Sequence, residues 1–328
     1  MGIGAGQSGM SGGEWRDLDG LTARQRRVLG ALTDVYAVSQ RVVAGDRHLY
    51  EALVGLAQPF ATRYPMVDGK GNFGSVDWEA PADMEYTEAR LAPIASDVEL
   101  LPLLLSNGGG GVPPHNLREV IAATIAYLDD REIDLRGLLG HIAGPDFPTG
   151  AILTNGADLP TIYESGRGRL LLRARADIEQ GPRGIQIVVS ELPFGVRKGG
   201  DGGVIVQIAD GVRSAVLAGV SDLLDESDHD NRWRSSWGSL LRLVIVLAAD
   251  VDPGEMLERL YAQTDLQVWL PVEMVARVDS APRLMGLRES ISEWVSARLR
   301  SGSQEAVRGE LLSVAERYGD ERRTTVAT

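Results

Sequence analysis

The chain has 328 residues, with 33 basic and 46 acidic side chains, a formal net charge of −13 and 44% apolar residues. That length predicts about two domains, and the apolar share excludes a broadly disordered chain. The acidic balance argues against a broadly basic nucleic-acid surface, the lack of a long apolar run excludes a membrane span, and the absence of cysteine excludes disulfides and thiolate metal sites.

The first predicted elements are a leader and two helices. Residues 1–13 carry six glycines and predict a disordered leader. The leader lacks the basic and apolar regions of a signal peptide, so we expect a cytoplasmic protein. A helix is predicted over 21–32. A second is predicted from Asp46, because apolar residues recur at helical spacing until Pro59 ends the pattern.

A turn-rich segment, an acidic segment and a strong helix come next. Residues 64–77 contain several glycines, which expose backbone amides, and residues 77–88 carry five carboxylates and no cation. The helix over 117–129 has an apolar stripe. Asn116 with Glu119 three residues later predicts a capping box at its start.

Strands, turns and some helix are expected to alternate over residues 145–280. Short β-branched or apolar runs predict strands at 185–189 and 242–248, and a helix is predicted over 284–299. From about Asp320 the chain is expected to fray. Four arginines at even spacing would project from one face of a strand, namely Arg167, Arg169, Arg173 and Arg175.

Nine blocks in the same order resemble the bacterial type IIA topoisomerase A subunits, the family that comprises the A subunits of DNA gyrase and topoisomerase IV. They cover most of residues 20–300. The blocks are GLTARQRRVL (20–29), AQPFATRYPMVDGKGNFGS (57–75), MEYTEARLA (84–92), PPHNLREVI (113–121), GPDFPTGAI (144–152), ESGRGRLLLRARADIE (164–179), ELPF (191–194), LLDESD (223–228) and LYAQTDLQV (260–268).

The resemblance implies an α+β fold with a reduced winged-helix region, then a mixed α/β tower domain and a C-terminal helix, without the exit-gate coiled coil of the family. The expected divisions are a leader at 1–13, a winged-helix or DNA-gate-like region at 14–112, a tower-like domain at 113–283, and a terminal helix and tail at 284–328.

The resemblance also implies a chemistry, in which a tyrosine attacks a DNA phosphodiester and forms a reversible phosphotyrosyl link. By its motif that tyrosine is Tyr86. A phenol with a pKa of about 10 needs a base or metal to remove its proton and cations to stabilise the phosphate in the transition state. No cofactor is expected to be intrinsic to the chain. Mg²⁺ and ATP are expected only through a B subunit.

Several departures from the family pattern predict that cleavage is lost or crippled. Glu85 stands where the family has an arginine that holds the scissile phosphate. The histidines that open the family's recognition helix are absent, as is the segment with the DNA-wedging isoleucine. The chain is expected to stop near the start of the exit-gate coiled coil.

Duplex DNA remains an expected partner, with candidate contacts in three regions. The alternative for the arginines is that they pair with the abundant acids. Contact with six to eight phosphates predicts a slope of log K against log salt of about −5 to −7. The candidates are Arg26, Arg27, Arg47, His48, Lys70, Arg167, Arg169, Arg173 and Arg175.

A ligand pocket next to the Tyr86 loop is a further hypothesis, built from Trp78, Phe73 and Tyr64. For His115, packing or capping is favoured over metal ligation, and no metal site is predicted. The acidic run that starts at Asp225 is interpreted as a solvated turn rather than a cation site.

Three functions compete. The first is a DNA-associated relative with impaired cleavage, and the second is a working topoisomerase that cleaves DNA together with a gyrase or topoisomerase IV B subunit. The third is a binding protein that captures a planar small molecule directed at gyrase or DNA, or that serves as a gyrase decoy. We favour a homodimer.

Overall fold

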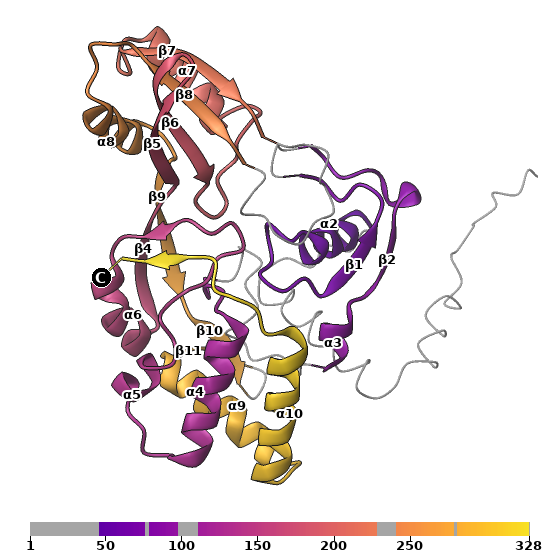
Figure 1. Ribbon diagram of the computed structural model, residues 1–328. Coiled ribbons are helices and arrows are strands. Elements are labelled where there is room, and N and C mark those ends of the chain that lie inside the picture. Colours follow the sequence, from indigo (N-terminus) through magenta and orange to yellow (C-terminus); the bar gives the residue numbers. More distant parts are fainter. Residues whose placement is uncertain (1–45, 76–78, 98–110, 228–240, 279–280, 328) are drawn as a thin grey trace, which may run out of the picture. The chain divides into compact units, whose positions relative to one another are not determined.

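The structure is a computed structural model that describes residues 46–75, 79–97, 111–227, 241–278 and 281–327 (Figure 1). The predicted leader, the helix at 21–32, Arg26, Arg27 and Trp78 lie outside these residues. The described part mixes helices with four small sheets, so the expected α+β class is confirmed. None of its helices has the length and apolarity that a membrane crossing requires.

The first described segment is a helix followed by a two-stranded hairpin. α2 begins at Asp46 and ends before Pro59, as predicted. Its last turn meets the hairpin where the Met66 amide donates to the Leu56 carbonyl at 3.1 Å. The elements of this segment are α2 (Asp46–Ala57), β1 (Val67–Lys70), η2 (Met84–Tyr86), β2 (Glu88–Leu91) and α3 (Pro93–Asp97).

A four-stranded sheet in the order β12-β3-β4-β9 follows. Alternate residues of β4, such as Leu170 and Leu172, are fully buried, whereas Arg167 and Arg169 are exposed. The elements around this sheet are α4 (Leu117–Asp129), α5 (Leu135–Leu139), β3 (Ile152–Leu153), η4 (Gly156–Asp158), α6 (Leu159–Ser165), β4 (Arg167–Arg173), β9 (Gln267–Glu273), β10 (Val275–Val278), β11 (Ala281–Leu284), α9 (Leu287–Leu299), α10 (Gln304–Tyr318) and β12 (Thr325–Val326).

A second four-stranded sheet has the order β5-β6-β8-β7. Its central strands confirm the predictions at 185–189 and 242–248, and Ile187 and Ile245 pair across them in a buried core. The elements are β5 (Arg175–Gly181), β6 (Gly184–Glu191), α7 (Val204–Arg213), β7 (Val220–Asp225), β8 (Leu243–Leu247) and α8 (Pro253–Gln263).

The prediction that four arginines share one strand face is wrong. Ala174 interrupts the run, and its amide donates to the Leu266 carbonyl at 2.7 Å. Arg167, Arg169 and Arg173 therefore lie on β4 in the first sheet, whereas Arg175 opens β5 in the second. Even spacing predicts a common face only while the strand continues.

The helix over 117–129 is confirmed, but only half of its capping box forms. The Asn116 side chain accepts hydrogen bonds from the amides of Arg118 and Glu119. The Glu119 carboxylate instead accepts from the Ala143 amide at 3.0 Å and pairs with Arg322 at 3.1 Å. A charged partner distant in the sequence thus outcompetes the local backbone donor.

The expectation that the chain frays from Asp320 is also wrong, because residues 320–327, here called the strap, are bonded along their length. The amides of Arg323 and Thr324 both donate to the Asp146 carboxylate, at 2.8 and 2.9 Å. Thr325 and Val326 then form β12, parallel to β3.

Lys198 and Asp225 form an ion pair beside the second sheet, 2.8 Å apart, with 2% of the lysine side chain exposed. Burial raises the pKa of the Asp225 carboxyl, but hydrogen bonds from Lys198 and Ser227 outweigh it, so the net pKa is lowered. Asp225 is thus paired. Asp228, His229 and Asp230, which follow it in the acidic run, lie outside the described residues.

Asp225→Asn is expected to lower the free energy of unfolding by about 1–3 kcal/mol at neutral pH, because Lys198 keeps its buried charge and loses the carboxylate. A carboxyl whose pKa is depressed on folding stabilises the protein above its unfolded pKa. It loses this effect as the pH falls through the lowered pKa. Urea unfolding across pH should therefore show wild type and variant converging in acid. A constant difference would contradict the pairing.

Candidate active site around Tyr86

Tyr86 lies in a single 3₁₀ turn directly before β2. Its amide donates to the Asp83 carbonyl at 2.9 Å, and the residue is 72% exposed. The glycine turn after β1 approaches it closely. Gly71 has φ +113°, and a Cβ there would lie 3.0 Å from the Tyr86 carbonyl oxygen. Only glycine adopts this conformation readily, so the close approach of the two backbones requires glycine at position 71.

The turn is held in place by the hairpin and by its own backbone. Glu88, two residues after Tyr86, lies opposite Lys70 in the β1–β2 ladder. Further out, the Ala82 amide donates to the Asn72 carbonyl at 2.9 Å, and the Asn72 side chain accepts from the Gly74 amide at 2.8 Å. The backbone around the phenol is therefore ordered by short-range hydrogen bonds.

Tyr50 connects α2 to this turn. Its hydroxyl donates to the Ala82 carbonyl at 2.7 Å and lies 3.0 Å from the Thr87 hydroxyl. Arg47 and His48, predicted DNA contacts, lie in the first turn of the same helix. A shift of α2 would thus be transmitted to the residues on both sides of Tyr86.

Tyr50→Phe is expected to cost about 1 kcal/mol, because it removes a partly buried hydrogen bond and leaves the ring in place. The lost hydrogen bonds are those to Ala82 and Thr87, so the effect should be local. Hydrogen exchange should rise in peptides covering 79–92 and not in α4. Tyr318→Phe, at the end of α10, serves as the matched control. Unchanged exchange in 79–92 would show that Tyr50 does not hold the turn.

The charges around Tyr86 are acidic or already paired. Glu85 is exposed, and in the described part of the chain neither it nor the Tyr86 hydroxyl has a hydrogen bond or ion pair. The hairpin cations have partners: Lys70 lies 3.2 Å from Glu88, and Arg90 lies 3.2 Å from Asp68. Both cations of the hairpin that the structure describes with their side chains are therefore already paired. The described residues also contain no group of three or more His, Asp or Glu side chains suited to a metal ion.

The pocket expected from Trp78, Phe73 and Tyr64 stays a prediction, because Trp78 lies outside the described residues. Burial raises the pKa of the Tyr64 phenol, whose hydroxyl donates to Asp320 at 2.8 Å and accepts from the Leu117 amide at 2.9 Å. The Phe73 ring instead packs against Gly69. The two aromatic rings serve different parts of the core, which gives no support to a ligand pocket built from them.

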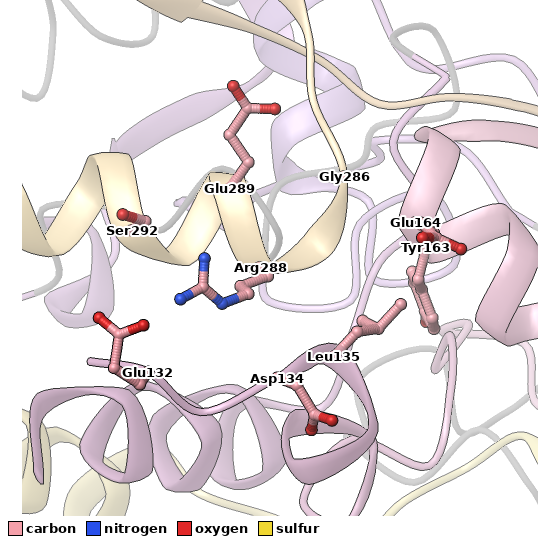
Figure 2. Close-up of a pocket in the computed structure, with 9 residues that line it drawn as sticks. All are labelled: Glu132, Asp134, Leu135, Tyr163, Glu164, Gly286, Arg288, Glu289 and Ser292. Carbon is pink, nitrogen blue, oxygen red and sulfur yellow. The ribbon is translucent and has the colours of Figure 1, made fainter. Parts of the chain in front are cut away.

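A pocket of about 490 Å³ lies elsewhere, between α5, α6 and α9 (Figure 2). Four carboxylates line it, and the guanidinium of Arg288 in its wall donates to the carbonyls of Ile133 and Arg131, at 2.7 and 2.8 Å. None of the predicted site residues lines it. The carboxylates are those of Glu132, Asp134, Glu164 and Glu289.

The remaining predicted DNA contacts are arginines with mixed surroundings. Arg167 pairs with Glu273 at 3.1 Å, Arg173 with Glu258 at 3.0 Å, and Arg175 with Glu191 at 3.1 Å. Arg169 differs, because its guanidinium lies over the Trp269 ring, 5.4 Å from the centroid. Pairing with acids, the alternative kept open above, thus holds for three of the four.

Two buried residues that sequence reasoning did not single out join the Tyr86 segment to the rest of the chain. Arg63 and Asp146 have fully buried side chains that lie 2.9 Å apart, and Arg63 also donates twice to Asp320, at 2.8 and 3.0 Å. His115 is likewise buried, 2.7 Å from the Tyr163 hydroxyl, in the packing role expected for it. The feature of the sequence that could have identified Arg63 and Asp146 is their position inside two of the blocks that resemble the family, 57–75 and 144–152.

Comparison with known proteins gives a consistent result. The family model for the DNA gyrase/topoisomerase IV A subunit matches residues 17–102 and 98–311. The DNA gyrase A subunit of Escherichia coli (strain K12) is 37% identical over 332 residues, which cover 85% of this chain and 37% of the relative. Its counterpart is 36% identical in Pseudomonas aeruginosa and 34% in Kosmotoga olearia, with 85% of this chain covered.

The chain spans between a third and two fifths of the length of these relatives, from 35% to 39%. The alignment with the Escherichia coli protein covers 332 positions, more than the 328 residues of the whole chain. It therefore includes gaps in this chain, in agreement with the shortened segments noted in the sequence.

Proposed function

Since the chain belongs to the DNA gyrase/topoisomerase IV A-subunit family, we propose that it is a DNA-associated A-subunit-like protein whose DNA cleavage is lost or severely impaired. The observation that carries this proposal is the setting of Tyr86. Its phenol is exposed, its neighbour Glu85 is a carboxylate, and the nearby Lys70 and Arg90 are in ion pairs.

The chemistry explains why this setting matters. Attack by a phenol at a phosphodiester builds negative charge on the phosphoryl oxygens, and cations aimed at that charge lower the barrier. A carboxylate next to the nucleophile repels the substrate and hydrogen-bonds to none of its oxygens when ionised. The retained tyrosine and glycine turn support descent from a protein that cleaves DNA. Glu85 supports a large loss in the rate of that cleavage.

The finer fold assignment is part of the same proposal. The segment 14–112 corresponds to a reduced winged-helix region, 113–283 to a tower-like domain, and 284–328 to the terminal helices and tail. The short link from α9, which ends at Leu299, to α10, which starts at Gln304, supports the absence of a long exit-gate coiled coil between these helices.

Partners follow from the family and are proposals for this chain. Duplex DNA would contact the first turn of α2 and the glycine turn, where Arg47, His48 and Lys70 lie. A gyrase or topoisomerase IV B subunit would supply Mg²⁺ and ATP hydrolysis in any residual reaction, and the chain would act as a homodimer. Phosphate contacts of this kind weaken steeply as salt rises.

The experiment that tests the proposal is plasmid cleavage by the full chain with a cognate B subunit, Mg²⁺ and ATP, with denaturant added to trap covalent intermediates. We expect duplex binding in a salt titration and no covalent protein–DNA adduct above the level of Tyr86→Phe. Adducts that form with the wild type and vanish in Tyr86→Phe would show a working nucleophile and refute the impaired-cleavage assignment.

A further inference from the structure

The outward face of the β4–β9 pair combines arginines with an exposed indole. In the antiparallel register Arg169 lies opposite Pro271, and Leu171 lies opposite Trp269. Arg169 and Trp269 are therefore diagonal neighbours on one face, close enough for long side chains to touch. The opposite face, with Leu170, is buried.

Arg169 is the only one of the four stripe arginines whose guanidinium has no carboxylate partner within the described residues. Its described side-chain contact is the stacking on Trp269, at 5.4 Å from the ring centroid. A guanidinium carries five N–H donors. Those of Arg169 remain available to an anion.

Trp269 is the second half of the feature. The residue is 54% exposed, although a tryptophan on a sheet usually buries most of its area. Pro271, two residues on and also exposed, extends a flat apolar surface beside it. The guanidinium of Arg169 holds the indole in position and leaves about half of it open to solvent.

We propose that Arg169 and Trp269 bind a nucleotide of a single-stranded nucleic acid, with the base stacked on the indole and the phosphate bonded to the guanidinium. A duplex keeps its base faces inside the stack, so an exposed indole on a flat sheet gains little from it. Unpaired bases stack on aromatic side chains without sequence preference, and arginines beside the aromatic track the backbone.

The charges of the neighbouring residues favour binding of a single nucleic-acid strand over binding of a broad polyanionic surface. Arg167 and Arg173 flank the pair along β4, but Glu273 and Glu258 neutralise them. A ligand bound by charge alone would find little net attraction here. A ligand with both a planar ring and an adjacent phosphate uses the two features that are free.

The test measures binding of fluorescein-labelled dT15 and of a 15-bp duplex by anisotropy, with quenching of tryptophan emission recorded in parallel. Base stacking is worth about 1–3 kcal/mol, so Trp269→Leu should weaken dT15 binding by roughly 5- to 150-fold. It should also abolish the main quenching signal. Arg169→Gln should weaken dT15 binding and reduce its salt dependence.

Arg213→Gln is the matched control, because it removes the same charge from an exposed arginine on α7. Its affinity for dT15 should equal that of the wild type, and circular dichroism confirms folding of all three variants. The proposal fails if Trp269→Leu binds dT15 like the wild type, if Arg213→Gln loses as much as Arg169→Gln, or if polyglutamate competes as well as dT15. Since plasmid cleavage plays no part in this readout, its outcome leaves the test intact.

Discussion

Arg63→Met is expected to lower the free energy of unfolding by about 3–5 kcal/mol, because removing one partner of a buried ion pair leaves the other charge uncompensated. The stranded group is Asp146, whose side chain is fully buried and 2.9 Å from Arg63. Burial alone would lower the pKa of Arg63, but its hydrogen bonds to Asp320 and the negative charges of Asp146 and Asp320 raise it, so the guanidinium stays charged.

Arg90→Met is the control for this variant. Its ion pair with Asp68 has the same chemistry, at 3.2 Å, but 82% of the arginine side chain is exposed. An exposed pair contributes only about 0–1 kcal/mol. Urea unfolding of both variants at neutral pH separates the cases. Equal small losses would mean that the hydrogen bonds which Asp146 accepts from the amides of Arg323 and Thr324 stabilise its charge without Arg63.

The loss in Arg63→Met should also be regional. Arg63 and the Tyr64 hydroxyl both bond to Asp320, so the variant loosens the 46–97 segment from the strap. Hydrogen exchange should rise in peptides containing β1 and in residues 320–327, with the central strand β8 protected as before. Uniform acceleration would show a global rather than a regional effect.

Glu85→Arg is expected to raise formation of the Tyr86–DNA adduct by about 10²–10³-fold, the range that one preorganised donor contributes to a reaction that builds an oxyanion. The substitution removes a repelling carboxylate and supplies a planar donor that matches phosphate. The substitution should leave the backbone conformation of the turn unchanged, because Glu85 is exposed and its side chain makes no hydrogen bond or ion pair in the described structure. Adducts are counted after denaturant trapping in the presence of Mg²⁺ and the B subunit.

Three comparisons make the Glu85→Arg result interpretable. Glu85→Gln should give a smaller gain, since it removes the repulsion without adding a cation. Glu132→Arg makes the same charge change at an exposed residue that lines the pocket between α5, α6 and α9, and it should give no adduct. Glu85→Arg combined with Tyr86→Phe should also give none. If Glu85→Arg stays inactive while still binding duplex, Glu85 is not what blocks cleavage.

Local patterns predicted the elements whose stability is local. The apolar stripe and the Asn116 cap fix α4, and β-branched runs fix β6 and β8, because these features act over a few residues. The arginine stripe was predicted as one face because nothing in its spacing marks Ala174 as the point where the chain passes into another sheet.

The site itself was predicted through family blocks, and its supports were not. Tyr86 and Gly71 lie in those blocks, whereas the partner of Arg63 lies 257 residues away in the chain. Polar pairing at that distance has no periodicity and no local propensity to reveal it. The Trp269 platform was missed for a related reason: exposure of an indole depends on which strand lies beside it.

The position of the strap near residue 320 determines the order in which contacts can form during translation. Arg63 is synthesised 257 residues before Asp320, a delay of roughly 13–50 s at about 5–20 residues per second. During that time Arg63 lacks Asp320, Asp146 lacks the amides of Arg323 and Thr324, and β3 lacks its parallel neighbour β12. The Tyr86 segment is thus translated early, and its bonds to the strap form only after residue 320 has been made, whereas its bonds to Leu117 and Asp146 need no residue beyond 146.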